Sequence, residues 1–501
     1  MRVLCVLDRR EMPASRLPMY PVAPVTKTFC GVMFISPEYY TQCSPKWIGQ
    51  AKCRSASRFL LENLITRRFQ ARQNHCIFMH LPHFQSTLRR DRRTITVWIF
   101  RSRSLSFRRS FSVRVACALA WLLATSALGL AQTLPPESLR KPAEADAQFL
   151  ATQGASLRFA SSSKISAEAE AAVRQQRIFS VPHFNGSFAA EGRTVPYTIV
   201  GSRPQEGGTT QIATQIQPLS LIFDGYVDDN GDPLVLDPEP IINRVRNSPN
   251  FRGAQYGTGF TQFGDAVQRA EFFKAMGQDW HTLLGAPQML KPLRIEVPAG
   301  LAKVFRNRST GTIYAVVDSA FFISQLNTIV QLADLKVDAL PIALTMNVFL
   351  APDSEPKRCC VLGFHTAFDA GVRGGVELVQ TLVWASWTEP GILGPSLADV
   401  TPMSHEISEW MNDPFGTNVV PEWQYPTGPA GCQDTLETGD PLAMHAAAGY
   451  PVTIDNFTYH PQNQVLLQWF ARQSPSDAID GALTFPDETL LTKVSQPCTA
   501  R

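Results

Sequence analysis

An uncharged, apolar segment at residues 115–131 divides this chain of 501 residues into two parts of opposite charge. The part before it holds 21 Lys and Arg residues against 5 Asp and Glu, and the part after it holds 25 against 38. A basic stretch that begins at residue 108 precedes the apolar segment, and the segment ends with the small residues Gly129 and Ala131. A basic stretch, an apolar core and small residues in this order are the arrangement of a secretory signal peptide. We therefore predict a signal peptide at 108–131 that is cleaved near Ala131. The acidic charge of the remaining chain argues against a nucleic-acid partner.

The residues before this signal are unexpected, because a signal peptide acts at the N-terminus of a chain. Residues 1–107 are rich in Arg, hold five of the ten cysteines and show no sustained helical or strand period. We interpret them as upstream translation that does not belong to the working protein, and we expect them to be disordered.

The alternative is a cytoplasmic extension of a protein that stays anchored in a membrane. The apolar run of 17 residues is at the lower limit for a membrane span, and no basic cluster follows it. The sequence therefore favours a secreted or periplasmic protein without a stable membrane span after cleavage.

The rest of the chain predicts a leader followed by one folded domain. Residues 132–176 are rich in Ala, Ser and Glu and lack a strong apolar face, so we interpret them as a leader, a linker or a pro-segment. Across 177–501, apolar runs of strand length and amphipathic helical patterns indicate a single α/β or α+β domain. Strands are expected at 194–200, 210–223, 294–305, 311–317, 340–350, 360–368 and 378–387, and helices at 261–276, 321–335 and about 397–412.

Four cysteines follow the predicted signal, namely Cys359, Cys360, Cys432 and Cys498. An even number in an exported chain permits two disulfides, with three possible pairings. Adjacent cysteines rarely bond to each other because the geometry is strained. We therefore expect at least one of the adjacent pair to bond to Cys432 or Cys498.

The expected helix at about 397–412 contains the pattern that most clearly indicates chemistry, His405-Glu406-Ile407-Ser408-Glu409. Its first and last residues are four positions apart, so they share one face of a helix. In the sequence His-Glu-x-x-His, two imidazoles bind one metal ion and the Glu acts as general base. Here a carboxylate replaces the second imidazole, and carboxylates also bind zinc. The pattern therefore predicts a site for zinc or another divalent metal.

A third ligand is expected from the chain that follows this helix. Glu437 is the first choice and Asp440 the second, and Asp413, one further helical turn along, is less favoured. Glu406 would take the proton of a metal-bound water, and His365 on an upstream strand would stabilise the oxyanion. The alternative interpretation is a solvated helix without a metal, because this short pattern also arises by chance.

The surroundings of the pattern resemble the plant phosphate-induced (exordium) family and related bacterial secreted proteins. The resemblance spans about residues 363–440 and rests on Gly363-Phe364-His365, on the run from His405 to Pro414, on Trp423, and on Glu437 with Asp440. It implies a secreted protein with a zincin-like mixed sheet and an active-site helix.

Together these features predict a secreted, zinc-dependent hydrolase that acts on a peptide or cell-envelope substrate. The alternative is a non-catalytic exported binding or cell-envelope protein that keeps the helix as a structural element. Convergence of the ligands on one point beside an open cleft favours the enzyme. A helix face that points to solvent or is sealed by packed side chains favours the alternative.

Overall fold

The computed structural model describes residues 86–90, 93–97, 139–146, 149–152, 162–394, 397–426 and 431–498. The chain forms two compact units, Met1–Leu122 and Leu123–Arg501. In the first unit, β1 (Ser86–Arg90) and β2 (Arg93–Val97) pair in antiparallel orientation. The predicted signal peptide at 108–131, its cleavage point and the rest of the upstream segment lie outside the described residues.

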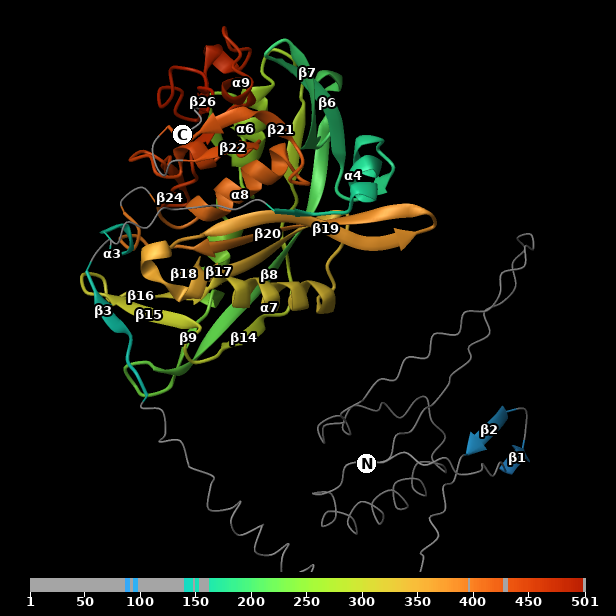
Figure 1. Ribbon diagram of the computed structural model, residues 1–501, viewed down its shortest axis with the longest axis vertical. Coiled ribbons are helices and arrows are strands. Elements are labelled where there is room, and N and C mark those ends of the chain that lie inside the picture. The colour runs from blue at the N-terminus through green and yellow to red at the C-terminus, as the bar shows by residue number, and fades with distance from the viewer. Residues whose placement is uncertain are drawn as a thin grey trace, which may run out of the picture. The chain divides into compact units, whose positions relative to one another are not determined.

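The second unit is built on a ten-stranded sheet, and the mixed α and β architecture predicted from the sequence is confirmed (Figure 1). Neighbouring strands from β12 to β20 are parallel, whereas β19 is antiparallel to β20. The order is β12 (His281–Leu284), β8 (Thr209–Val227), β17 (Ala339–Met346), β20 (Val376–Trp387), β19 (Gly363–Arg373) and β4 (Ser162–Lys164). Along this path, β8 also pairs with β9 (Pro233–Leu236), β13 (Gln288–Met289) and β14 (Leu293–Val297), and β20 with β5 (Ile178–Phe179).

A second sheet has four strands in the order β18 (Val348–Ala351), β16 (Ile313–Asp318), β15 (Ala302–Asn307) and β3 (Ala143–Ala145). The segment interpreted as a leader thus contributes β3 to this sheet, β4 to the main sheet, and helix α4 (Ala167–Arg174). Two runs expected as single strands are each divided in two, because the chain turns between β14 and β15 and between β17 and β18. The second turn lies at Asn347, whose φ is 55°.

Two helices cover opposite faces of the main sheet (Figure 1). Adjacent residues of a strand point to opposite faces, and on β17 the side chains of Ile342 and Leu344 pack with α8 (Thr401–Asn412), whereas Ala343 packs with α7 (Ser319–Leu332). The central strand is apolar on both faces because both faces are covered.

Helix α8 confirms the helix expected at about 397–412 and is buried along its whole length. Ile407, Trp410 and Met411 face the core between the helix and the sheet. The helix also packs against α6 (Phe263–Glu271), where a Cβ atom on Gly264 would lie 2.4 Å from Met411 Sδ and Gln268 Nε2 donates to the carbonyl oxygen of Met411 at 2.9 Å. A donor at this position satisfies one of the carbonyl groups that a helix leaves free at its C-terminal end.

Shorter elements complete the second unit. Among the described residues, the remaining α-helices are α3 (Phe149–Thr152), α5 (Ile242–Arg246) and α9 (Leu467–Phe470). The two-stranded pairs are β6 (His183–Ala190) with β7 (Arg193–Val200), β10 (Ala254–Tyr256) with β11 (Gly259–Thr261), β21 (Val419–Gln424) with β22 (Cys432–Thr435), β23 (Val452–Ile454) with β24 (Phe457–Tyr459), and β25 (Gln464–Val465) with β26 (Thr484–Phe485). In the described part of the chain, no helix has the length and hydrophobicity that a membrane span requires.

The disulfide pairing expected from the sequence is wrong. Cys359 bonds to its neighbour Cys360, across a cis peptide bond with Cα atoms 3.1 Å apart, and Cys432 bonds to Cys498. The adjacent pair is buried in a core with Phe349, whereas the second bond lies beside Trp423 in a different core. Cys359 and Cys360 are buried, whereas Cys432 is exposed and Cys498 is half-buried, so the two bonds lie in different surroundings.

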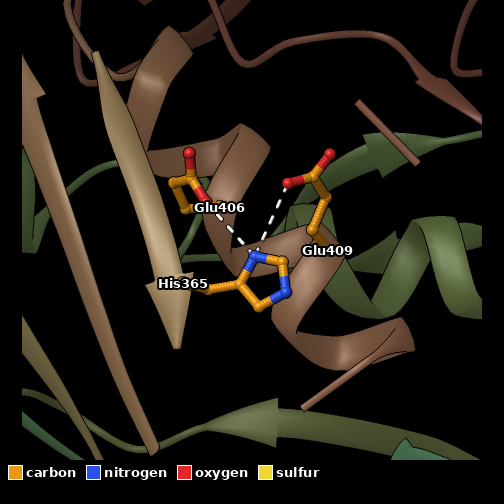
Figure 2. A group of neighbouring side chains, drawn as sticks. All are labelled: His365, Glu406 and Glu409. Atoms are coloured by element: carbon orange, nitrogen blue, oxygen red, sulfur yellow. Dashed lines mark hydrogen bonds and ion pairs between the residues drawn. The ribbon is translucent and has the colours of Figure 1, made fainter. Parts of the chain in front are cut away.

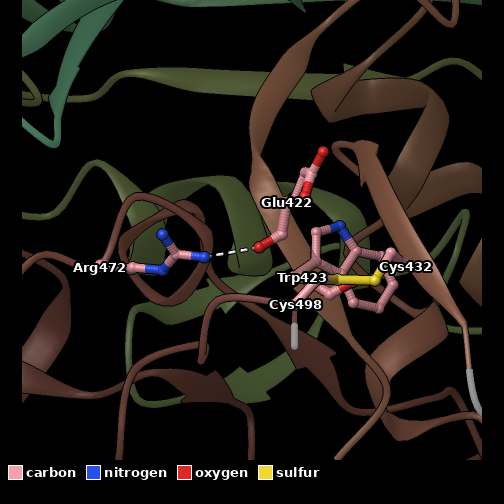
Figure 3. Close-up of a disulfide and its surroundings, with 5 residues drawn as sticks. All are labelled: Glu422, Trp423, Cys432, Arg472 and Cys498. Atoms are coloured by element: carbon pink, nitrogen blue, oxygen red, sulfur yellow. Dashed lines mark hydrogen bonds between the residues drawn. A yellow bond between two sulfur atoms is a disulfide. The ribbon is translucent and has the colours of Figure 1, made fainter. Parts of the chain in front are cut away.

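The second disulfide joins the start of β22 to the C-terminal segment (Figure 3). Nearby, Arg472 Nη2 donates to the carbonyl oxygen of Glu422 on β21 at 2.5 Å. Both contacts hold the β21–β22 pair, and the chain that leaves β22 leads directly to Glu437 and Asp440.

Candidate metal centre

Helix α8 presents the two residues that the sequence analysis places on one helical face. His405 Nε2 lies 2.9 Å from Glu409 Oε1, one turn along the helix. Asp440, in the short 3-10 turn η6 (Asp440–Leu442), brings its Oδ1 atom to 3.7 Å from the same His405 nitrogen. The ligand atoms of these three side chains lie within 4.8 Å of one another, so this group can hold a metal ion.

A second group forms where β19 meets the same helix (Figure 2). His365 Nδ1 lies 3.3 Å from Glu406 Oε2 and 3.6 Å from Glu409 Oε2. Alternate residues of a strand share a face; Gly363 and His365 face α8, whereas Phe364 packs in the core on the α7 side. These three titratable side chains also form a group that can hold a metal ion. Glu409 therefore belongs to both groups, with one oxygen in each.

Two glycines permit the close packing of these side chains. A Cβ atom on Gly363 would lie 2.7 Å from Glu406 Cγ, and a Cβ atom on Gly439 would lie 2.4 Å from His405 Nδ1. Carbon and nitrogen atoms that are not bonded do not approach this closely, so both positions require a residue without a side chain.

The orientation of His405 is set by Gln462, between β24 and β25. Gln462 Nε2 donates to the carbonyl oxygen of Gly439 at 2.6 Å, which turns Gln462 Oε1 toward His405 Nδ1 at 3.0 Å. Because an amide oxygen only accepts, Nδ1 carries a proton, and Nε2 is the nitrogen that faces the two carboxylates.

Hydrogen bonds also hold the carboxylates of the first group. Glu409 Oε1 accepts from the backbone N–H groups of Gly439 at 3.0 Å and Asp440 at 3.3 Å. Asp440 Oδ2 accepts from Tyr425 OH at 2.7 Å and from Gln433 Nε2 at 3.4 Å. Asp440 is thereby fixed through Oδ2, and its Oδ1 remains for a different partner. In Glu409, Oε1 accepts both N–H groups and also faces His405, whereas Oε2 has no hydrogen-bond partner among the described residues.

We use the name metal centre for six side chains, each at most 4 % exposed: His365, His405, Glu406, Glu409, Glu437 and Asp440. Four of their carboxylate oxygens have no hydrogen-bond partner in the described part of the chain, namely Glu406 Oε1, Glu409 Oε2, Glu437 Oε2 and Asp440 Oδ1. Burying such an atom without a partner is unfavourable. Imidazole and carboxylate ligands suit zinc and other divalent metals, so the residues present fit such an ion.

The histidines and carboxylates shift one another's pKa values. Burial disfavours the charged form of His405, but the neighbouring carboxylates, chiefly Glu409, outweigh burial and raise its pKa to about 9. Burial likewise opposes a charged His365, yet its contacts with Glu406 and Glu409 raise its pKa well above the usual value. Burial would raise the pKa of Glu409, but the two histidines outweigh it and lower that pKa.

The other carboxyl groups of the centre hold their protons more tightly than usual. Burial raises the pKa of Glu406 to about 7 and that of Asp440 to about 6. Burial, followed by the charge of Glu409, also raises the pKa of Glu437 well above its usual value. In the absence of a cation, protons therefore reduce the negative charge of the centre.

The structure places the predicted residues as follows. Asp440 joins the group of His405, whereas Glu437 is buried nearby but belongs to neither group. Asp413 ends α8, where its carboxylate accepts the backbone N–H groups of Thr417 and Asn418, each at 2.9 Å. His365, expected to stabilise an oxyanion, faces two carboxylates of the helix.

Sequence reasoning missed the residues that orient the ligands. Gln462 is 57 positions from the imidazole that it contacts, whereas Tyr425 follows β21 and Gln433 lies in β22. No spacing in the sequence signals such contacts, because they depend on where separate segments meet.

No family model, curated protein or solved structure matches this chain. Membership of an exordium-like family stays a prediction, and the geometry of the metal centre carries the functional argument.

Proposed function

We propose that this protein is an exported, divalent-metal-dependent hydrolase with a zincin-like active site and a peptide or cell-envelope substrate. The observation that carries the proposal is the convergence of His405 Nε2, Glu409 Oε1 and Asp440 Oδ1 on one buried point. Zinc is the cation that this set of nitrogen and oxygen ligands fits.

Zinc held by His405, Glu409 and Asp440 would supply a Lewis acid and lower the pKa of a bound water. Glu406 is the residue that would accept the proton of that water. Its Oε2 atom lies 3.3 Å from His365 Nδ1, while its Oε1 atom has no hydrogen-bond partner in the described part of the chain. Burial raises the pKa of Glu406 to about 7, which suits a group that takes up and returns a proton near neutral pH.

The second candidate function is a non-catalytic exported protein in which the cation only stabilises the fold. The burial of all six side chains of the metal centre favours it, because structural zinc sites are closed whereas catalytic sites keep a position open to substrate. For the hydrolase, substrate must therefore reach the centre through a movement of the segments that cover it.

The decisive experiment compares the parent protein with Glu406→Gln after zinc loading. An internally quenched peptide library reports hydrolysis, and elemental analysis reports the zinc content. We expect the parent to cleave the library and E406Q to retain the zinc held by His405, Glu409 and Asp440 but to lose turnover by at least about a hundredfold. Equal turnover in the two proteins would reject the role of Glu406.

A second measurement separates the two candidate functions. Cobalt in place of zinc gives a visible spectrum that changes when an added ligand enters the coordination sphere. A hydroxamate should alter this spectrum if the site opens to substrate. An unchanged spectrum, together with no cleavage of the library, would favour the structural role.

A further inference from the structure

The two oxygens of Glu409 face two different ligand groups. Oε1 lies 2.9 Å from His405 Nε2, and Oε2 lies 3.6 Å from His365 Nδ1. Oε2 has no hydrogen-bond partner in the described part of the chain, although the side chain is 1 % exposed. A carboxylate placed in this way can bind a different cation through each oxygen.

One cation cannot account for both groups. Zinc–ligand bonds are about 2.0–2.2 Å long, so the ligands of one ion lie within roughly 4 Å of one another. Among the described residues, no group whose ligand atoms all lie within 4.8 Å of one another contains both His365 and His405, and Glu409 is the member that their two groups share. The geometry thus contains two cation positions joined by one carboxylate.

The charge of the metal centre also matches two divalent cations. Four carboxylates, those of Glu406, Glu409, Glu437 and Asp440, are buried together, and all of these but Glu437 form ion pairs with His365 or His405. Histidine binds metals in its neutral form. When the carboxyls are ionised, one divalent cation leaves two buried negative charges uncompensated, whereas two cations neutralise all four.

We propose that the metal centre binds two divalent cations bridged by Glu409. The first position is that of the proposed function, on which this inference rests, with His405 and Asp440 as its further ligands. The second position has His365 and Glu406, and Glu437 is available to complete either. Two-metal hydrolytic sites hold their ions about 3.5–4 Å apart, the separation that a single bridging carboxylate permits.

Glu406 serves both positions through different atoms. Its Oε2 atom, now 3.3 Å from His365, becomes a ligand of the second cation. Its Oε1 atom, which has no hydrogen-bond partner in the described residues, remains to accept the proton of a water. The second cation takes the place that the proton of His365 occupies between Glu406 and Glu409 when no cation is present.

Cation stoichiometry tests this inference on the purified full chain. The protein is stripped with a chelator and titrated with zinc, and the bound zinc is measured after gel filtration. We expect two equivalents in the parent, one in His365→Gln, and two in the control His445→Ala, because His445 lies outside the metal centre. One equivalent in the parent that is unchanged in H365Q and lost in His405→Ala would overturn the second position and leave the first intact. No bound zinc at all would overturn the proposed function as well.

A measurement on the parent protein avoids dependence on any variant. Two manganese ions bridged by a carboxylate are exchange-coupled, and electron paramagnetic resonance distinguishes them from isolated ions. We expect a coupled spectrum when the full chain is loaded with manganese. A spectrum of isolated ions at saturation would refute the bridged pair.

Discussion

The substitution Asp440→Asn separates what the fold requires of the metal centre from what a cation requires. The amide preserves the shape of the side chain, and its oxygen can still accept from Tyr425 OH, which lies 2.7 Å from Asp440 Oδ2. The substitution removes a carboxylate close to Glu409. We expect the cation-free protein to become more stable and the cation-bound protein to become less stable.

The size of the effect follows from the pKa of Asp440. Burial, followed by the carboxylate of Glu409, raises this pKa from 3.8 to about 6. A pKa difference of one corresponds to about 1.4 kcal/mol, so the ionised side chain lowers the free energy of unfolding near neutral pH by about 3 kcal/mol. The folded protein holds the proton more tightly than the unfolded chain. The decrease in the free energy of unfolding is therefore absent below about pH 4, grows between about pH 4 and pH 6, and is complete above that range.

Urea denaturation in the presence of a chelator measures this difference. Near neutral pH, the free energy of unfolding of D440N should exceed that of the parent by about 1–3 kcal/mol. The lower value applies if burying the amide of the new side chain costs part of the gain. Near pH 4 the two should agree, and saturating zinc should reverse their order. Asp434→Asn, at an exposed position on the neighbouring strand, is the control and should change little. A D440N protein less stable than the parent near neutral pH without cation would refute the reasoning.

Three further predictions concern the ligands and their supports. Gly439→Ala places a Cβ atom 2.4 Å from His405 Nδ1, so the zinc affinity measured by chelator competition should fall by at least about tenfold. The control Gly431→Ala has open space around its Cβ atom and should leave the zinc affinity unchanged. Gln462→Leu removes the acceptor for His405 Nδ1 and should weaken zinc binding by about 10–100-fold. Gln462→Glu keeps an acceptor oxygen and should recover part of the affinity. Equal zinc affinities in Q462L and the parent would contradict the role of Gln462 in positioning His405. Because the pKa of His405 is raised to about 9, zinc binding near neutral pH should release protons. The heat of zinc binding measured by calorimetry should therefore depend on the ionisation enthalpy of the buffer. Heats that do not change with the buffer would argue against zinc binding at this imidazole.

Local patterns in the sequence were sufficient for the elements that form the core. The apolar run at 340–350 predicted a buried strand, although Asn347 divides it into β17 and β18. The pattern at about 397–412 predicted α8, which the structure confirms as Thr401–Asn412. These predictions succeeded because the period of apolar residues reflects local backbone geometry. The disulfide prediction failed because pairing depends on which segments the fold brings together, and the spacing of cysteines contains no such information.

For the metal centre, the sequence by itself determined the pair on one helical face. His405 and Glu409 are one turn apart in any helix, so their approach needed no tertiary information. The glycines at 363 and 439 were also visible in the sequence, but only the fold explains them, since each faces a side chain of α8.

The tertiary structure decided which other side chains meet that pair. The path of the chain after β22 brings Asp440 to His405 and leaves Glu437 beside the group, and the register of β19 places His365 against Glu406 and Glu409. Metal coordination depends on distances of a few ångströms between segments far apart in the sequence. Such distances are set by strand register, loop path and helix packing together, and residue spacing along the chain does not contain them.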